Sequence, residues 1–263
     1  MKKIKVDIPF LISVFILVIA GFLIFSSASL GLLSKQAAKY SNVAFNQTFF
    51  GLFLGSVACL ITTHVDYKIY RKYSFYIFIA AVFLTLLVFV PGIGLAHGGA
   101  KRWIHLGTLS FQPSEFLKIG FIMFFSAWMA KAKDKAGRFK EGFLPFIVLI
   151  GIVGSVLLLQ PDTDTFLIIV FGGLAVYLTG GGKWRYVPIL GVCGIIGLGV
   201  IAYTRPYVMS RLTTFMNPAD NALGSGYQIQ QSLIAVGSGG LFGRGFGQSI
   251  QKFNVLPEPI GDS

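Results

Sequence analysis

Charged residues are scarce in this sequence. They make up 12% of its 263 residues, about half of the share that is usual in a soluble globular domain. Apolar residues make up 54%, and the mean hydropathy is +0.74. This composition excludes an ordinary soluble domain and predicts an integral membrane protein.

Cysteine is also rare. The two cysteines, Cys59 and Cys193, both lie inside apolar runs. This placement excludes a disulfide framework and a zinc motif of paired cysteines. We therefore predict no metal site from side-chain spacing.

Acidic residues are outnumbered by basic ones. Ten Asp and Glu residues stand against 22 Lys and Arg residues, which gives a formal net charge of +12. Such an excess can indicate a nucleic-acid partner, but here the basic residues form short clusters between apolar runs. That pattern is typical of topology signals and of contact with anionic lipid headgroups. We expect membrane lipids as partners and no nucleic acid.

Long apolar runs dominate the first three quarters of the chain. A helix needs about 20 apolar residues to cross a bilayer. The sequence therefore predicts an all-α, polytopic membrane bundle with about seven spans and a long extracytoplasmic loop. The predicted spans are roughly Ile8–Leu30, Phe45–Thr63, Phe75–Val90, Phe116–Ala130, Phe143–Leu159, Phe166–Thr179 and Val187–Tyr203.

The distribution of Lys and Arg predicts the orientation of these spans. With a cytoplasmic N-terminus, thirteen basic residues fall in the inner segments and eight in the outer ones, as the positive-inside rule requires. The basic start resembles that of a signal peptide. The apolar run after it is too long, however, and has no clear cleavage site, so we interpret it as a retained span.

The segment from residue 205 to residue 263 differs from the rest because it is rich in glycine and proline. We predict two domains, a seven-span bundle over residues 1–204 and an extracytoplasmic loop over residues 205–263. Within the loop, Arg211–Pro218 is predicted to be a turn. Tyr227–Val236 is predicted to be a short amphipathic helix that ends at Gly237–Gly240. The chain stops soon afterwards, which suggests a fragment with further spans missing.

A first group of candidate site residues surrounds the fourth span. Arg102 and Trp103 precede it, and Ser114 and Glu115 suit its N-terminus as a cap and as a charge at the positive end of the helix dipole. Lys118 lies one turn inside the span, where a charge costs about 2.5–3.5 kcal/mol. It either extends to the surface or faces an internal cavity beside Glu115. A cavity with Arg102, Lys118 and Lys101 would suit a phosphate or pyrophosphate group.

Two further stretches carry polar residues. In the turn Gln160–Thr165, Asp164 is predicted to cap the next helix, whereas Asp162 could bind a cation or pair with a basic residue. Gly239–Gly247 contains five glycines but lacks the Lys-Ser/Thr ending of a phosphate-binding P-loop, which excludes that motif. Near the end of the chain, prolines and glycines surround Asp262, and a general base needs a carboxylate on such a fixed backbone.

Together these stretches resemble the SEDS family, the polytopic cell-wall polymerases that include FtsW and RodA. The serines of Ser26–Ser29 and the stretch Pro91–Gly94 are more similar to the FtsW branch. The resemblance covers the whole chain in order. Its motifs are Gly99–Ile104, Gln112–Lys118, Gln160–Asp162, Arg211–Pro218, Gly224–Ile229, Gln231–Ala235, Gly237–Gly243 and Leu256–Glu258.

The resemblance implies a bundle of about ten spans with a large outer loop after the seventh, in the bacterial cytoplasmic membrane. It implies polymerisation of lipid II, the undecaprenyl-pyrophosphate disaccharide peptide, for septal wall synthesis. The implied partners are a class B penicillin-binding protein and the division machinery. Alternatives are a lipid II flippase and an elongation polymerase of the RodA type.

By the same resemblance, Asp262 is the catalytic candidate, the last residue of a motif that many members write Leu-Pro-Glu-x-His-Thr-Asp. Here Ile260 and Gly261 replace His and Thr, but Asp262 stays in register. In the turn after Gln160, the family usually has an apolar residue and Gly before Thr, and this chain has Thr163 and Asp164. A divalent cation is a possible cofactor. The implied substrate- or pyrophosphate-binding residues are Arg102, Trp103, Glu115, Lys118, Arg211, Lys252 and Glu258.

Overall fold

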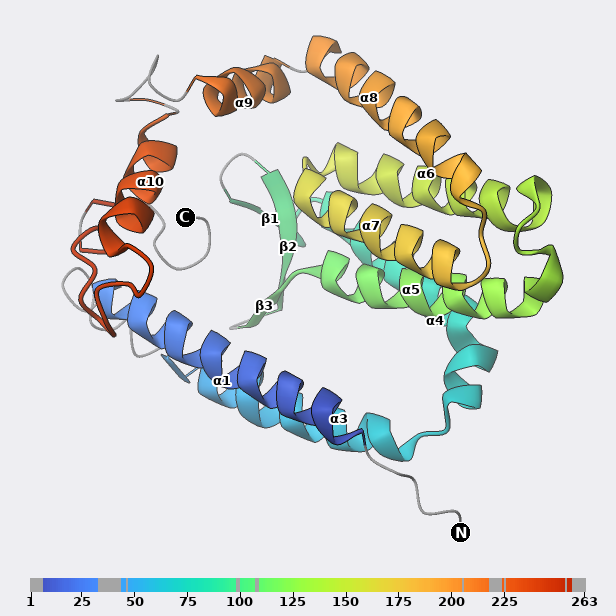
Figure 1. Ribbon diagram of the computed structural model, residues 1–263, viewed down its shortest axis with the longest axis horizontal. Helices are drawn as coiled ribbons and strands as arrows, with labels where there is room; N and C mark the ends of the chain where they lie inside the picture. Colours follow the sequence, from blue (N-terminus) through green and yellow to red (C-terminus); the bar gives the residue numbers. More distant parts are fainter. Residues whose placement is uncertain are drawn as a thin grey trace. The chain divides into compact units, whose positions relative to one another are not determined.

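The computed structural model describes residues 7–32, 44–45, 47–97, 100–106, 109–204, 206–217, 224, 226–253 and 255–256 (Figure 1). The chain divides into two compact units. One comprises Met1–Thr63 with Gly197–Ser263, and the other comprises His64–Ile196. Helices account for most of the described residues, so the predicted all-α class is confirmed, with one small sheet in addition.

Each of the seven predicted apolar runs is helical, because a long apolar segment satisfies its backbone hydrogen bonds internally. Several helices begin or end in short 3₁₀ or π-helical turns. In chain order the elements are α1 (Ile8–Ser29) with η1 (Leu30–Leu32), η2 (Gln47–Leu54) with α3 (Gly55–His64), α4 (Tyr67–Leu86) with η3 (Leu87–Phe89), α5 (Pro113–Ala132) with η4 (Lys133–Lys135), η5 (Phe139–Phe143) with α6 (Leu144–Leu159), α7 (Thr163–Thr179), and η6 (Trp184–Tyr186) with α8 (Val187–Thr204).

Four helical stretches in the described part of the chain are long and apolar enough to cross a membrane. They are Ile8–Ser29, Gln47–His64, Tyr67–Phe89 and Phe139–Leu159. Two shorter apolar helices, Thr163–Thr179 and Trp184–Gly197, follow. Helix α5 is not among these, because its N-terminal half carries Glu115 and Lys118.

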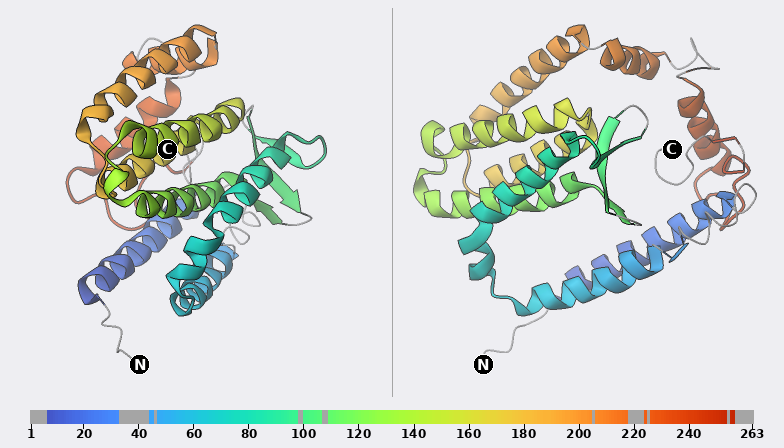
Figure 2. Two further views of the ribbon diagram at one scale, coloured as in Figure 1. Left: turned by 90° about the vertical axis from the view of Figure 1, so that its right-hand side faces the viewer. Right: turned by 180° about the vertical axis from the view of Figure 1, so that it is seen from behind.

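Helices α4 to α7 form the core of the unit His64–Ile196. They lie side by side in both views, with α5 against α4 and α7 (Figures 1 and 2). Aromatic rings fill the space between them: Phe125 stacks on Phe146 at 5.2 Å, and Phe146 stacks on Tyr177 at 5.9 Å. Gly173 lies directly against the rings of Phe121 and Phe146, so the absence of a side chain there lets α7 approach closely.

A three-stranded antiparallel sheet precedes α5 in the same unit. Its strands are β1 (Gly94–His97), β2 (Ala100–Leu106) and β3 (Leu109–Phe111), in the order β1-β2-β3. The sequence analysis missed this sheet. In the β1–β2 pairing, Trp103 lies opposite Leu95 and Lys101 lies opposite Ala96, so Arg102 is the extra residue of a β-bulge. Trp103 is exposed, and the neighbouring Ile104 is buried. A bulge can redirect a side chain, and here Arg102 reaches the backbone carbonyls of Gln160 and Pro161.

The described C-terminal part contains two more helices, α9 (Pro206–Met216) and α10 (Tyr227–Gly239). The prediction of a turn at Arg211–Pro218 was wrong, because Arg211 to Met216 belong to α9. Pro206 suits the first helical position, and no helix breaker follows before residue 217. The predicted amphipathic helix is confirmed as α10. It continues to Gly239 and ends where Gly240 has a φ of +58°.

Candidate functional site

A buried carboxylate, Asp162, lies at the centre of a polar cluster in the unit His64–Ile196. It stands between α6 and α7 with only 2% of its surface exposed. Its Oδ2 accepts hydrogen bonds from Gln112 Nε2 and Ser114 Oγ, each at 3.1 Å, and Arg102 Nη1 lies 4.0 Å from Oδ1. A buried charge needs such partners to offset its lost hydration. The cluster therefore joins β2, the start of α5 and the α6–α7 turn.

Two further sets of hydrogen bonds fix the turn between α6 and α7, one from Arg102 and one from Gln160. Arg102 donates its Nε to the carbonyl of Gln160 at 3.5 Å and its Nη2 to the carbonyl of Pro161. The side chain of Gln160 is buried and donates to the carbonyl of Thr85, at the end of α4, at 2.7 Å. Four separate segments thus meet at this turn, and the geometry makes Arg102 and Asp162 partners.

Two sequence predictions about capping were wrong. Ser114 is not an N-cap: Gln112 holds that position, and the hydroxyl of Ser114 donates to Asp162 instead. Asp164 does not cap α7 either, since Asp162 occupies the N-cap position and Asp164 lies exposed in the first turn. The buried carboxylate of Asp162 needs hydrogen-bond donors, and the hydroxyl of Ser114 serves as one of them instead of capping α5.

Glu115 and Lys118 form an ion pair in the first turns of α5. Lys118 Nζ lies 2.8 Å from Glu115 Oε1, as their spacing of three residues predicted. The side chain of Lys118 is 25% exposed and that of Glu115 is 56% exposed. The pair thus retains solvent-accessible charge near the start of α5. Whether Lys118 shares a phosphate-binding cavity with Arg102 and Lys101 stays a prediction.

Lys252 belongs to the other unit, where it is almost fully buried. Its Nζ donates to the carbonyl of Ser27 in α1 at 3.0 Å and lies 5.0 Å from the centre of the Phe253 ring. The backbone N–H of Gly247 donates to the hydroxyl of Ser27 at 2.9 Å. Burial lowers the pKa of Lys252 below its ordinary value. In this structure Lys252 anchors the segment around it to the end of α1, and its role with substrate stays a prediction.

Gly31 makes that anchoring possible, because the carbonyl of Lys252 lies where a side chain at Gly31 would begin. We expect Gly31→Ala to detach the segment and to raise the rate of tryptic cleavage at Lys252 about tenfold, since overpacking of this kind costs about 1–3 kcal/mol. Cleavage after the exposed Arg244 provides an internal reference. Gly21→Ala is the matched control: Gly21 lies in α1, which η1 follows directly, and no atom outside the local helix backbone lies within 4 Å of a side chain added there. Equal cleavage in both variants would contradict the anchoring role.

For the remaining predicted site residues, the structure gives either the backbone position alone or no description. Arg211 lies within helix α9. Glu258 and Asp262 lie outside the described residues. Among the residues that are described, no group of three or more His, Cys, Asp or Glu side chains could hold a metal ion.

Sequence reasoning did not assign roles to Gln112, Gln160 or Thr85. Both glutamines directly precede a proline at a helix boundary. An amide at the end of an apolar run must find a hydrogen-bond partner if it is buried, and this is the signal that could have identified them. The identity of that partner depends on which helices pack together, and residue spacing in the sequence does not reveal this.

The comparison with family models identifies this architecture. The model of the cell cycle proteins FtsW, RodA and SpoVE matches residues 8–263. The chain belongs to this family. The SEDS resemblance is thereby confirmed, and with it the description of the chain as a multi-pass membrane protein.

Curated members of the FtsW/RodA/SpoVE family align with nearly the whole chain. Stage V sporulation protein E of Bacillus subtilis is 34% identical, over 99% of this chain and 71% of its own length. The probable peptidoglycan glycosyltransferase FtsW of Geobacter sp. strain M18 is 36% identical, over 97% of this chain and 70% of its own length. The chain thus spans about 70% of these two relatives.

Solved structures of the family share the fold. A chain of a peptidoglycan synthase complex, described for its coordination of polymerization and crosslinking, has a TM-score of 0.63 at 27% identity. The match covers 84% of this chain and 65% of that one. A mutant form of the rod shape determining protein RodA of Thermus thermophilus has a TM-score of 0.57 at 26% identity, over 71% of this chain and 57% of that one. Both matches support a helical membrane bundle for this chain.

Proposed function

We propose that the protein is a peptidoglycan glycosyltransferase that polymerises lipid II into glycan strands during septal wall synthesis. The observation that carries this proposal is the family match over residues 8–263, with relatives named as probable peptidoglycan glycosyltransferases FtsW. The curated FtsW of Geobacter is 36% identical and the RodA structure 26%. Several of the curated relatives are named FtsW, which supports the division branch.

The proposed chemistry is glycosyl transfer. Asp262 accepts the proton of the 4-hydroxyl of the acceptor sugar, and that oxygen attacks the anomeric carbon of the growing lipid-linked chain. The bond between this carbon and the pyrophosphate oxygen breaks, and undecaprenyl pyrophosphate leaves. A carboxylate is suited to this step because it is ionised at neutral pH and accepts a proton as the new bond forms.

The leaving pyrophosphate gains charge as the bond breaks, and cations stabilise it. Arg102 and Lys118 are the described candidates nearest the start of α5, with side chains 25% exposed in each case. Asp162 holds Arg102 from one side, and Glu115 holds Lys118. We assign these carboxylates a positioning role. Trp103, Arg211, Lys252 and Glu258 complete the proposed substrate-binding set.

The proposed orientation has a cytoplasmic N-terminus and an extracytoplasmic segment over residues 205–263. The excess of Lys and Arg in the segments predicted to be inside supports it. The proposed partner is a class B penicillin-binding protein, because a structural relative belongs to a peptidoglycan synthase complex. Such a pairing would couple strand synthesis to crosslinking.

The decisive experiment is an assay of full-length protein in proteoliposomes with lipid II and the partner penicillin-binding protein. Glycan strands resolved by gel electrophoresis are the expected product. A transporter would instead move fluorescent lipid II between leaflets and leave it monomeric. Monomeric lipid II that crosses the bilayer would overturn the polymerase proposal in favour of a flippase.

A further inference from the structure

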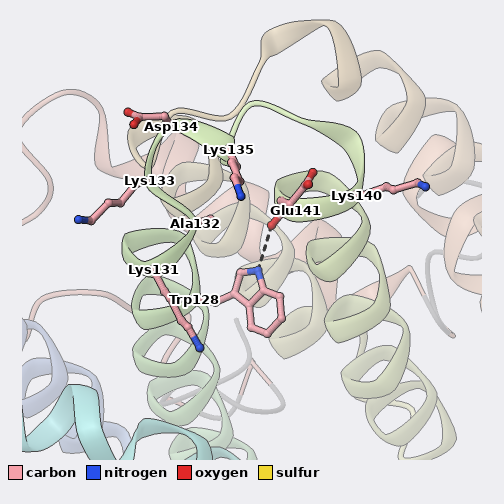
Figure 3. Close-up of a pocket in the computed structure, with 8 residues that line it drawn as sticks. All are labelled: Trp128, Lys131, Ala132, Lys133, Asp134, Lys135, Lys140 and Glu141. Atoms are coloured by element: carbon pink, nitrogen blue, oxygen red, sulfur yellow. Dashed lines mark hydrogen bonds between the residues drawn. The ribbon is translucent and has the colours of Figure 1, made fainter.

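A cavity of about 470 Å³ lies where α5 ends and α6 begins. In Figure 3 the side chain of Lys135 points toward Trp128 and Glu141, whereas the side chains of Lys133 and Lys140 extend outward on opposite sides. The cavity belongs wholly to the unit His64–Ile196 and contains none of the proposed substrate-binding residues. It is lined by Trp128, Lys131, Ala132, Lys133, Asp134, Lys135, Lys140 and Glu141.

The lining is strongly basic. Four lysines stand against one aspartate and one glutamate. Among the residues that the structure describes, the ion pairs are Arg102–Asp162 and Glu115–Lys118. None of the four lysine ammonium groups at the cavity is therefore paired with a carboxylate of a described residue. Their positive charge favours an anionic ligand at this cavity.

The loop that carries these lysines is fixed by its backbone. The indole N–H of Trp128 donates to the carbonyl of Glu141 at 3.0 Å, and the dashed line in Figure 3 marks this bond. The N–H of Ala136 donates to the carbonyl of Lys133 at 2.9 Å. Lys133 has a φ of +45°, a backbone conformation that is strained for a residue with a side chain. The loop that carries the lysines therefore has a defined backbone conformation.

The cavity lies at a membrane boundary. Helix α6 begins directly after it and is among the helices apolar enough to span, and α5 ends directly before it. Tryptophan favours the headgroup level, which fits Trp128. The segment 131–140 is one of those that the Lys and Arg distribution predicts to face the cytoplasm, where the bilayer surface is anionic.

We propose that this cavity binds the phosphate group of an anionic phospholipid, with phosphatidylglycerol as the representative ligand. The lysines neutralise the phosphodiester through charge-assisted hydrogen bonds. The ring of Trp128 packs beside the glycerol and the first acyl carbons. Lysines that served only as topology signals would attract an anionic surface in general. They would need neither a cavity nor a fixed loop.

The test is lipid competition on the full-length protein by native mass spectrometry. The probes are phosphatidylglycerol and phosphatidylcholine with identical acyl chains at equal concentration. We expect the tightest site to prefer phosphatidylglycerol about tenfold, and Lys133→Gln with Lys135→Gln to remove that preference, because each basic residue near a bilayer surface contributes about 1 kcal/mol. If this variant does not fold, Lys131→Gln with Lys140→Gln tests the same cavity.

The matched control is Lys68→Gln with Arg71→Gln, which removes two exposed charges from another inner segment. A preference that is kept in this control and lost in the cavity variant supports the site. An equal loss in both, or no preference in the parent protein, overturns it. A third arm adds inorganic phosphate: displacement of the lipid at millimolar phosphate would mean that the cavity takes a soluble phosphate, and the lipid assignment would fail.

Discussion

Replacing Asp262 by alanine is expected to reduce the rate of lipid II polymerisation about 10²- to 10⁴-fold, the usual contribution of a general base. The acceptor hydroxyl would then have no group to take its proton as its oxygen attacks. Binding of lipid II would change much less, because the base acts mainly in the transition state. The measurement is the initial rate of lipid II consumption in proteoliposomes, with the partner present and the amount of inserted protein matched.

Asp220→Ala is the control for this prediction, because it makes the same change in the same predicted extracytoplasmic segment. It should polymerise at the parent rate. Asp262→Asn keeps the shape of the side chain but removes its basicity, so it should be as slow as Asp262→Ala. If both Asp262 variants make strands at the rate of Asp220→Ala, Asp262 is not the base, while the polymerase proposal itself still stands.

The helices at the seven predicted spans were predictable because hydrophobicity determines them, whereas the mixed composition of α9 led to the wrong prediction of a turn. Runs such as Ile8–Leu30 and Phe143–Leu159 are long and contain no charged residue. A backbone buried in lipid has few alternatives to a helix. The small sheet was not predictable in the same way. Its strands are short, the longest being Ala100–Leu106, and their pairing depends on register, which a single sequence specifies weakly in so short a stretch.

The candidate site was partly predictable. The spacing of three residues between Glu115 and Lys118 predicts their ion pair, because such residues are neighbours on a helix. The partners of Asp162 could not be found this way: Ser114 lies 48 residues away and Gln112 lies 50 residues away. Contacts of that range follow from how α5, α6 and α7 pack. The sequence left a pairing of Asp162 with a basic residue open, and the structure provides Arg102.

We expect Asp162→Ala to destabilise the protein by about 3 kcal/mol. The substitution leaves the half-buried amide of Gln112 and the buried hydroxyl of Ser114 without their acceptor, and an unsatisfied buried group costs about 1–3 kcal/mol. Arg102 also loses its carboxylate, but it is partly exposed and 4.0 Å away, so that loss contributes little. The measurement is reversible unfolding of the purified protein in mixed micelles.

Asp164→Ala is the matched control, since Asp164 lies two residues further along and is exposed. Its stability should stay within about 0.5 kcal/mol of the parent. Asp162→Asn keeps an oxygen that can accept from Ser114 but not a charge for Arg102, so its loss of stability should fall between the two. If Asp162→Ala and Asp164→Ala have the same free energy of unfolding, the cluster does not hold β2, α5 and the α6–α7 turn together.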